Sequence, residues 1–266
     1  MMKEILIVFF LLSSIVSYGQ GISYRIEKDV RYTNGQTDYE VEKCRLDFYY
    51  PENKEDFTTL IWFHGGGLTG GGKQLPDYLL NKGIAIIGAG YRLAPKVDVV
   101  DILEDAADVV KWAFENVEKV GGNKSKIVVG GISAGAYLSL MIGLDKNILA
   151  GRGISADSLL GVVSFSGQTI THFTARKQAG INGLQPVIDK LAPLYWVRKD
   201  APKVLLITGD RELELMGRYE ENAYLYRMLK LVGHTNVSIF ELDGYGHDME
   251  YPAYPILLKK IEEWSK

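Results

Sequence analysis

A serine stands between two glycines in the segment Gly-Ile-Ser-Ala-Gly at 131–135. A β-branched stretch precedes this segment and an apolar stretch follows it. Glycine on both sides lets a strand and a helix pack across a sharp turn, which holds the serine strained with its hydroxyl exposed. The N-terminus of the following helix favours developing negative charge at that point. Ser133 is therefore the candidate nucleophile.

A second glycine run, His-Gly-Gly-Gly at 64–67, follows the apolar stretch 59–63. Backbone N–H groups converge on an oxyanion only where side chains leave room, and consecutive glycines provide that room. We expect the N–H groups of Gly66, Gly67 and Ala134 to form a three-donor oxyanion hole. A flexible linker is the alternative interpretation of the run.

Transfer of the serine proton requires a base whose pKa lies near neutrality, which points to histidine. His64 belongs to the glycine run and is expected to support its shape, His172 lies in an irregular segment, and His234 lies at a helix end. His247 follows the last predicted strand in a glycine-rich loop, where function is expected in parallel sheets. It also satisfies the chain order serine, acid, histidine. We predict that His247 is the general base.

The acid of such a triad orients the imidazole and stabilises its charged form. Three carboxylates follow the apolar stretch 204–207, namely Asp210, Glu212 and Glu214. One of them is expected to point at His247 while the others carry solvated or helix-terminal charge. Spacing alone leaves all three open.

The elements that position these residues alternate between strand and helix after a pair of antiparallel strands within 22–50. This alternation predicts an α/β fold with a mostly parallel central sheet and helices on both faces. The predicted strands lie at 59–63, 84–87, 126–130, 160–165, 204–207 and 237–242. The predicted helices lie at 75–82, 99–118, from the serine turn to about 143, 218–231 and 256–264.

Residues 1–19 are typical of a secretory signal peptide, with an apolar run too short for a comfortable membrane span and small residues before a cleavage site near Gly19-Gln20. An uncleaved anchor is the alternative. We expect a secreted or periplasmic protein with no stable membrane insertion after cleavage. Residues 20–266 are expected to form one domain, with a small lid-like insertion around 167–200.

The composition of the chain excludes several classes of partner and cofactor. A net charge of −3 gives no basic field for nucleic acid. The single cysteine, Cys44, excludes an intramolecular disulfide and a cysteine-built zinc site. We expect no metal or organic cofactor, and a small-molecule or saccharide ester as substrate; the oligomeric state is open.

The ordered set of motifs resembles the α/β-hydrolase superfamily, and within it the hormone-sensitive-lipase-like and carbohydrate-esterase branch. The matching pieces are the glycine run at 64–67, Tyr-Arg-Leu-Ala-Pro at 91–95, the serine turn at 131–135, the loop after Gly209, and Gly246-His247. The resemblance covers about residues 40–266. It implies an α/β-hydrolase fold with an N-terminal antiparallel hairpin.

The resemblance also selects an acid. In this branch the acid is commonly the third residue after the glycine of a Gly-x-x-Asp loop, and that position is Glu212 here. Two departures from the branch pattern, Ile132 for an acidic residue and Gly135-Ala136 for Gly-Gly, suggest a relative of the small carbohydrate esterases.

The motifs and the resemblance together predict a secreted serine carboxylesterase for short-chain acyl esters, with acetyl or feruloyl groups on carbohydrates as the favoured substrates. In this interpretation Ser133 attacks, His247 is the base and Glu212 is the acid. An amidase, formamidase or peptidase-like hydrolase on the same fold is the alternative, since triad geometry does not separate esters from amides. A catalytically idle hydrolase fold used for binding is the alternative from another class.

Overall fold

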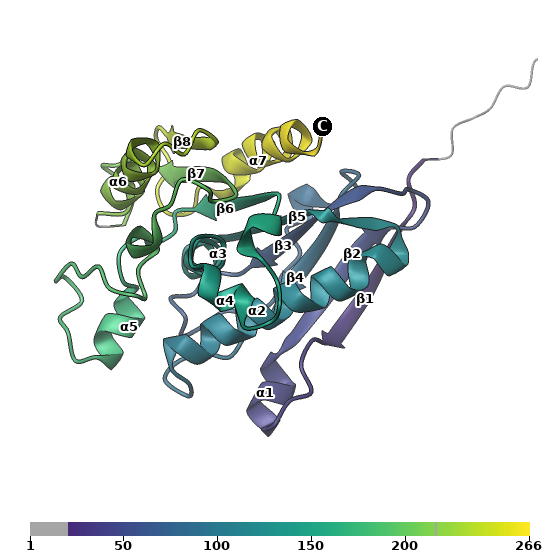
Figure 1. The fold of residues 1–266 in the computed structure, drawn as a ribbon, viewed down its shortest axis with the longest axis horizontal. Coiled ribbons are helices and arrows are strands. Elements are labelled where there is room, and N and C mark those ends of the chain that lie inside the picture. Colours follow the sequence, from purple (N-terminus) through teal and green to yellow (C-terminus); the bar gives the residue numbers. More distant parts are fainter. Residues whose placement is uncertain (1–20, 216) are drawn as a thin grey trace, which may run out of the picture.

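The computed structural model describes residues 21–215 and 217–266. The predicted signal peptide and its cleavage site therefore lie outside the described residues. The strands form one eight-stranded sheet in the order β1-β2-β4-β3-β5-β6-β7-β8 (Figure 1). Their bounds are Tyr24–Arg31, Arg45–Pro51, Phe57–Phe63, Ala85–Ala89, Gly122–Ile132, Gly161–Phe165, Lys203–Gly209 and Val237–Leu242 for β1 to β8.

Strand direction changes only at one end of the sheet. β2 pairs antiparallel with both β1 and β4, whereas β4, β3, β5, β6, β7 and β8 are parallel to one another. The predicted mostly parallel sheet with an N-terminal antiparallel hairpin is therefore confirmed. Because six strands share one direction, their carboxyl ends meet at one edge of the sheet, which brings the loops that follow them together.

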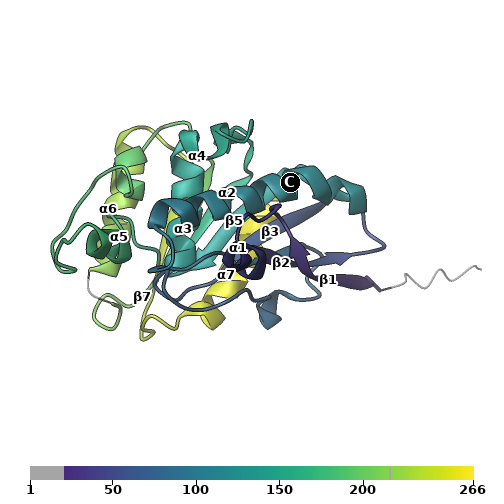
Figure 2. The ribbon, with the colours of Figure 1, turned by 90° about the horizontal axis from the view of Figure 1, so that it is seen from below.

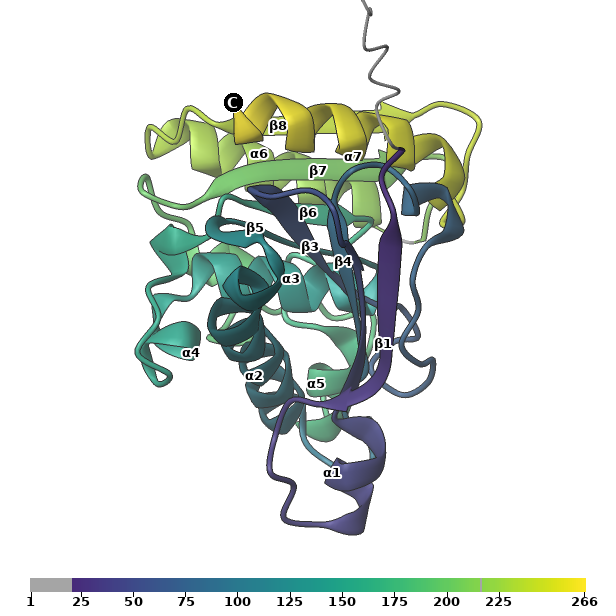
Figure 3. The same cartoon turned by 90° about the vertical axis from the view of Figure 1, so that its right-hand side faces the viewer.

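Helices cover both faces of the sheet, with α2 and α3 on one side and α7 on the other (Figure 3). The helices α1 to α7 span Asp38–Lys43, Val99–Asn116, Ala134–Leu144, Lys146–Ala150, Phe173–Gln178, Arg218–Leu231 and Glu250–Ser265. Short 3₁₀ turns, η1 to η4, cover Asp77–Leu79, Val117–Val120, Ala156–Ser158 and Pro193–Trp196.

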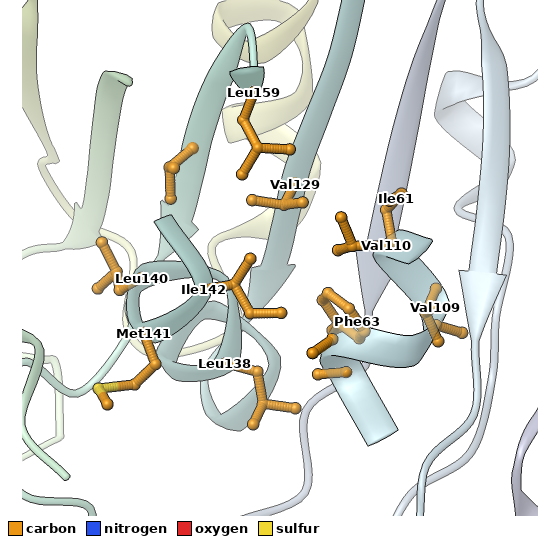
Figure 4. Packing of buried hydrophobic residues seen from close by; sticks show 14 of the residues in the cluster. Ile61, Phe63, Val109, Val110, Val129, Leu138, Leu140, Met141, Ile142 and Leu159 are labelled. Carbon is orange, nitrogen blue, oxygen red and sulfur yellow. The ribbon is translucent and has the colours of Figure 1, made fainter. Parts of the chain in front are cut away.

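The central strands supply side chains to two separate cores. Ile61 and Phe63 of β3 belong to the core under α2 and α3, and Figure 4 shows them facing those helices. Leu60 and Trp62, the alternate residues, belong to the core under α7. Successive side chains of a strand point to opposite faces, so a strand buried on both faces has a continuous apolar sequence.

Helix α3 is buried over its whole length, from Ala134 to Leu144. Its sequence is apolar on every side, which is typical of a helix enclosed by protein. Leu138, Leu140, Met141 and Ile142 fill the space between the sheet and the helices packed beside it (Figure 4). The helix that begins directly after Ser133 is thus held firmly in place.

Three predicted elements need correction. The helix predicted at 75–82 is only the 3₁₀ turn η1, because Leu80 is extended and Asn81 adopts a left-handed conformation, so the chain turns into β4. The antiparallel stretch at 22–50 contains the short helix α1, whose N-cap Thr37 accepts a hydrogen bond from the N–H of Glu40. Helix α7 begins at Glu250 rather than 256, with Pro252 in its first turn, where proline is tolerated, and Pro255 inside the helix.

The segment 167–200 is largely irregular and carries α5 and η4. In both Figure 1 and Figure 2, α5 and α6 lie at the end of the molecule opposite β1. Within the described residues, no helix combines the length and the apolar character that crossing a membrane requires.

Candidate active site

Ser133 occupies the turn between β5 and α3, in a backbone conformation that non-glycine residues rarely adopt (φ 55°, ψ −114°). Its N–H donates to Phe165 O at 2.8 Å, which ties the turn to the end of β6. Such a conformation costs about 1–3 kcal/mol and persists only where the surroundings enforce it. The buried helix and the strand on either side enforce it here, as the sequence predicted.

The two glycines that flank the serine are required by close packing. A Cβ atom on Gly135 would lie 2.0 Å from Phe63 O, and one on Gly131 would lie 2.5 Å from the same oxygen. Both contacts involve backbone and cannot be relieved by moving a side chain. The turn therefore packs directly against the end of β3, from which the other glycine run begins.

That run, at 64–67, lies beside the serine. A Cβ atom on Gly65 would lie 3.5 Å from Ser133 Cβ. Gly66 and Gly67 have φ of 113° and 63°, which favours glycine, and their N–H groups donate to no residue in the described part of the chain. Ala134 is the first residue of α3, where the N–H has no partner within the helix. The structure thus leaves all three expected donors free close to Ser133.

His64 packs beneath the glycine run at 64–67 and helps to hold its shape. It is buried, its ring stacks on Tyr91 with centroids 4.2 Å apart, and its Nδ1 lies 2.7 Å from Gly65 O. The Tyr91 hydroxyl donates to His64 O at 2.7 Å. Burial lowers the pKa of His64. These contacts agree with the expectation that His64 holds the loop in shape.

The segment 91–95 is anchored by a carboxylate that the sequence did not single out. Arg92 Nη2 donates to Asp105 Oδ1 at 2.6 Å, and the Arg92 N–H donates to Asp105 Oδ2 at 2.9 Å. Asp105 is buried on α2. This pair fixes the position of Tyr91, and through it the position of His64.

His247 lies in the loop between β8 and α7, and its partner is Glu214. The distance from His247 Nδ1 to Glu214 Oε1 is 2.7 Å, and the Glu214 side chain is 0% exposed. Glu214 also accepts hydrogen bonds from Ser166 Oγ and from the backbone N–H groups of Gly209 and Leu215. Burial alone would raise the pKa of Glu214, but the hydrogen bonds from His247 and Ser166 outweigh it and lower the pKa to about 2. Glu214 is therefore a carboxylate at every physiological pH.

The expected contact between Glu212 and His247 is not formed, and the choice of acid is corrected to Glu214. Asp210 O accepts the N–H of Glu214 at 2.8 Å, and Asp210 Oδ1 accepts the N–H of Glu212 at 2.9 Å. These bonds wind the loop into a helical turn that leaves Glu212 exposed and carries Glu214 inward. Asp210 itself is used within the loop, where its Oδ2 accepts the N–H of Gly244 at 3.0 Å.

Ser166 is a site residue that sequence reasoning missed. It is fully buried at the end of β6, with φ 52°, and its Oγ lies 3.2 Å from His247 Nδ1 while donating to Glu214. Its position directly after a parallel strand, next to a glycine, was the available signal.

The two remaining histidines have structural partners. His172 is buried at the N-cap of α5, where its Nδ1 accepts the N–H of Thr174, and burial lowers its pKa to about 3. His234 is also buried, with Nδ1 3.0 Å from Lys199 O. In the described ranges no three His, Cys, Asp or Glu side chains group as metal ligands would.

Comparison with known proteins places the chain in a family. The BD-FAE family model matches residues 46–217. Esterase LipC of Mycobacterium tuberculosis is 26% identical over 220 residues, which are 72% of this chain and 53% of LipC. Carboxylesterase NlhH of the same organism is 24% identical over 171 residues, 62% of this chain and 50% of NlhH. The chain thus spans about half the length of these two relatives.

Among solved structures, a truncated carbohydrate esterase from gut microbiota superposes with a TM-score of 0.76 at 17% identity, covering 92% of this chain and 97% of that one. This likeness confirms the predicted fold. The chain belongs to the BD-FAE family and has an α/β-hydrolase fold.

Proposed function

We propose that this chain is a serine carboxylesterase that works through an acyl-enzyme on Ser133. The observation that carries the proposal is the pairing of His247 with the buried carboxylate of Glu214, at the sheet edge where Ser133 stands in a strained turn. Names given to the relatives, esterase and carboxylesterase, support the same chemistry.

In the first half-reaction Ser133 Oγ attacks the ester carbonyl carbon while His247 Nε2 accepts the hydroxyl proton. The hydrogen bond from His247 Nδ1 to Glu214 leaves Nε2 as the basic nitrogen and stabilises the imidazolium. The imidazolium then gives its proton to the departing alcohol as the C–O bond breaks. Water attacks the acyl-enzyme by the same route, which releases the acid and restores Ser133.

The carbonyl oxygen becomes an oxyanion in each half-reaction. The free N–H groups of Gly66, Gly67 and Ala134 are the donors proposed to bind it. Loss of one such donor typically costs about 10²–10³ in rate. Because these donors are backbone groups held by buried elements, they need no reorganisation as charge develops.

For the natural substrate, we propose short acyl groups such as acetyl or feruloyl on carbohydrates. The structural likeness to a protein named carbohydrate esterase supports this choice. The apolar run within 1–19 supports export of the enzyme to the periplasm or the exterior.

The test is a series of 4-nitrophenyl esters from acetate to octanoate, assayed with the wild-type protein and Ser133→Ala. We expect turnover that falls by about 10⁴–10⁶ in the variant, because triad members act as a unit. Activity of Ser133→Ala within tenfold of wild type would overturn the assignment. No ester turnover combined with fluorophosphonate labelling of Ser133 would favour an amidase, and no labelling would favour a binding protein.

A further inference from the structure

A cavity of about 720 Å³ lies between the segment 167–200 and the start of α6. Its size is within the range of small-molecule sites. Its lining includes Ile170, Phe173, Arg176, Leu184, Leu215 and Arg218.

The cavity adjoins the candidate active site at two points. Leu215 directly follows Glu214, the partner of His247. The Phe173 ring stands over the glycine run, since a Cβ atom on Gly67 would lie 2.8 Å from Phe173 Cζ. The cavity therefore lies beside both the glycine run and the loop that carries Glu214.

Two buried arginines line the cavity. Arg176 and Arg218 are 3% and 4% exposed. Each donates through Nη1 to a backbone carbonyl, Gln185 O for Arg176 and Ser166 O for Arg218. The Nε atoms of both are buried without a hydrogen-bond partner among the described residues. Both guanidinium groups thus keep unused donors.

The carboxylates nearby are committed to other partners. Glu221 Oε2 accepts the N–H of Thr169 at 2.9 Å, Glu214 pairs with His247, and Glu220 is exposed. Burial lowers the pKa of Arg218, and the neighbouring charge of Arg176 lowers it further against the opposing effect of Glu221 and Glu214. The hydrogen bonds of both arginines go to backbone carbonyls and not to these carboxylates, and a carboxylate is the partner that matches the guanidinium fork.

We infer that this cavity binds a carboxylate carried by the substrate, through Arg176 and Arg218. The inference rests on the proposed esterase function and narrows its substrates to anionic esters. The carboxylate belongs either to the acyl part, as in a hemiester of a dicarboxylic acid, or to the alcohol part, as in an acylated uronic acid. Ile170, Phe173 and Leu184 form apolar walls for the carbon framework.

Two matched substrate pairs distinguish the two sources. For the acyl part, 4-nitrophenyl hemiglutarate is compared with 4-nitrophenyl valerate; for the alcohol part, acetylated galacturonic acid is compared with acetylated galactose. We expect wild-type protein to prefer the anionic member of one pair by about 10- to 100-fold in kcat/KM, the value of charge-assisted hydrogen bonds. Equal or lower kcat/KM for the anionic member of both pairs would overturn the inference.

The variant Arg176→Gln tests whether Arg176 is responsible for the preference for anionic esters. We expect it to abolish the anionic preference, and Arg176→Lys to restore part of it, because lysine keeps the charge but not the fork. Lys177→Gln, an exposed residue of the same helix, is the matched control for charge. If Arg176→Gln and Lys177→Gln both lose the anionic preference, the cause is a long-range electrostatic field. If Arg176→Gln lowers kcat/KM equally for neutral and anionic esters, Arg176 has a structural role. Either result overturns the inference.

Binding separates this inference from the esterase proposal. Galacturonate and galactose are titrated into the Ser133→Ala protein by calorimetry, which requires no turnover. Binding of galacturonate that Arg176→Gln removes would support the carboxylate site even if no ester were cleaved. When neutral esters are turned over through Ser133 but neither anionic preference nor galacturonate binding is seen, the esterase proposal stands and the carboxylate site falls.

Discussion

Replacement of Glu214 by glutamine is the sharpest perturbation of the candidate triad. The two carboxylate oxygens accept hydrogen bonds from four donors. Oε1 faces His247 Nδ1 and the Leu215 N–H, and Oε2 faces Ser166 Oγ and the Gly209 N–H. A glutamine NH₂ group therefore meets a backbone N–H donor in either orientation, and neither backbone donor can become an acceptor.

The two amide orientations both impair the proposed chemistry. With NH₂ toward His247, the imidazole must accept at Nδ1, and Nε2 then carries the proton and cannot act as base. With NH₂ toward Ser166, the hydroxyl can rotate to accept, but the negative charge that stabilises the imidazolium is gone. We expect kcat/KM for 4-nitrophenyl acetate to fall by about 10²–10⁴, which corresponds to ~2.7–5.4 kcal/mol of transition-state stabilisation.

Glu212→Gln is the matched control, because it makes the same chemical change two residues away at an exposed side chain. We expect its kcat/KM to stay within about twofold of wild type, as is usual for surface substitutions. Circular dichroism and thermal unfolding verify that both variants are folded. A larger loss for Glu212→Gln than for Glu214→Gln would refute the assignment of the acid.

Two further predictions concern the same cluster. Ser166→Ala removes a hydroxyl donor to Glu214, so we expect kcat/KM to fall about tenfold in ester assays, the value of one charge-assisted hydrogen bond. Ser158→Ala, the same change at an exposed position, is the control, and an equal loss there would contradict the role of Ser166. The pKa of Glu214 is lowered from 4.5 to about 2, so it contributes about 3 kcal/mol to stability above pH 4.5, and this contribution is lost as the pH falls through 2. In urea unfolding, the stability advantage of wild type over Glu214→Gln should shrink as the pH falls from about 5 to 2; an advantage independent of pH would show that the ionised carboxylate is not its source.

The sequence was most informative where chemistry and packing impose the same residue. Gly131 and Gly135 are needed because the serine turn touches the backbone of β3, so the pattern around Ser133 indicates both the turn and its neighbours. Continuous apolar stretches identified the parallel strands, since residues such as Leu60 and Ile61 are buried on opposite faces. The alternation of strands with helices then predicted the sheet.

Residue spacing could not identify the acid, because the acid is selected by how one turn of the chain is wound. Asp210, Glu212 and Glu214 alternate with other residues within five positions, and each is compatible with a loop after a parallel strand. The bonds from Glu212 and Glu214 back to Asp210 decide which carboxylate points inward. An aspartate that caps its own turn in this way was the local signal for that winding.

Ser166 connects the candidate triad with the arginine cavity, and this connection determines how variants there should be interpreted. Its hydroxyl donates to Glu214, while its carbonyl accepts a hydrogen bond from Arg218. A substitution of Arg218 would therefore disturb the residue that contacts His247 as well as the proposed carboxylate site. Arg176, by contrast, is bonded to the backbone of Gln185 in the insertion. Substitution of Arg176 should therefore change the preference for anionic esters without changing the triad. Substitution of Arg218 should change both, because Arg218 contacts Ser166.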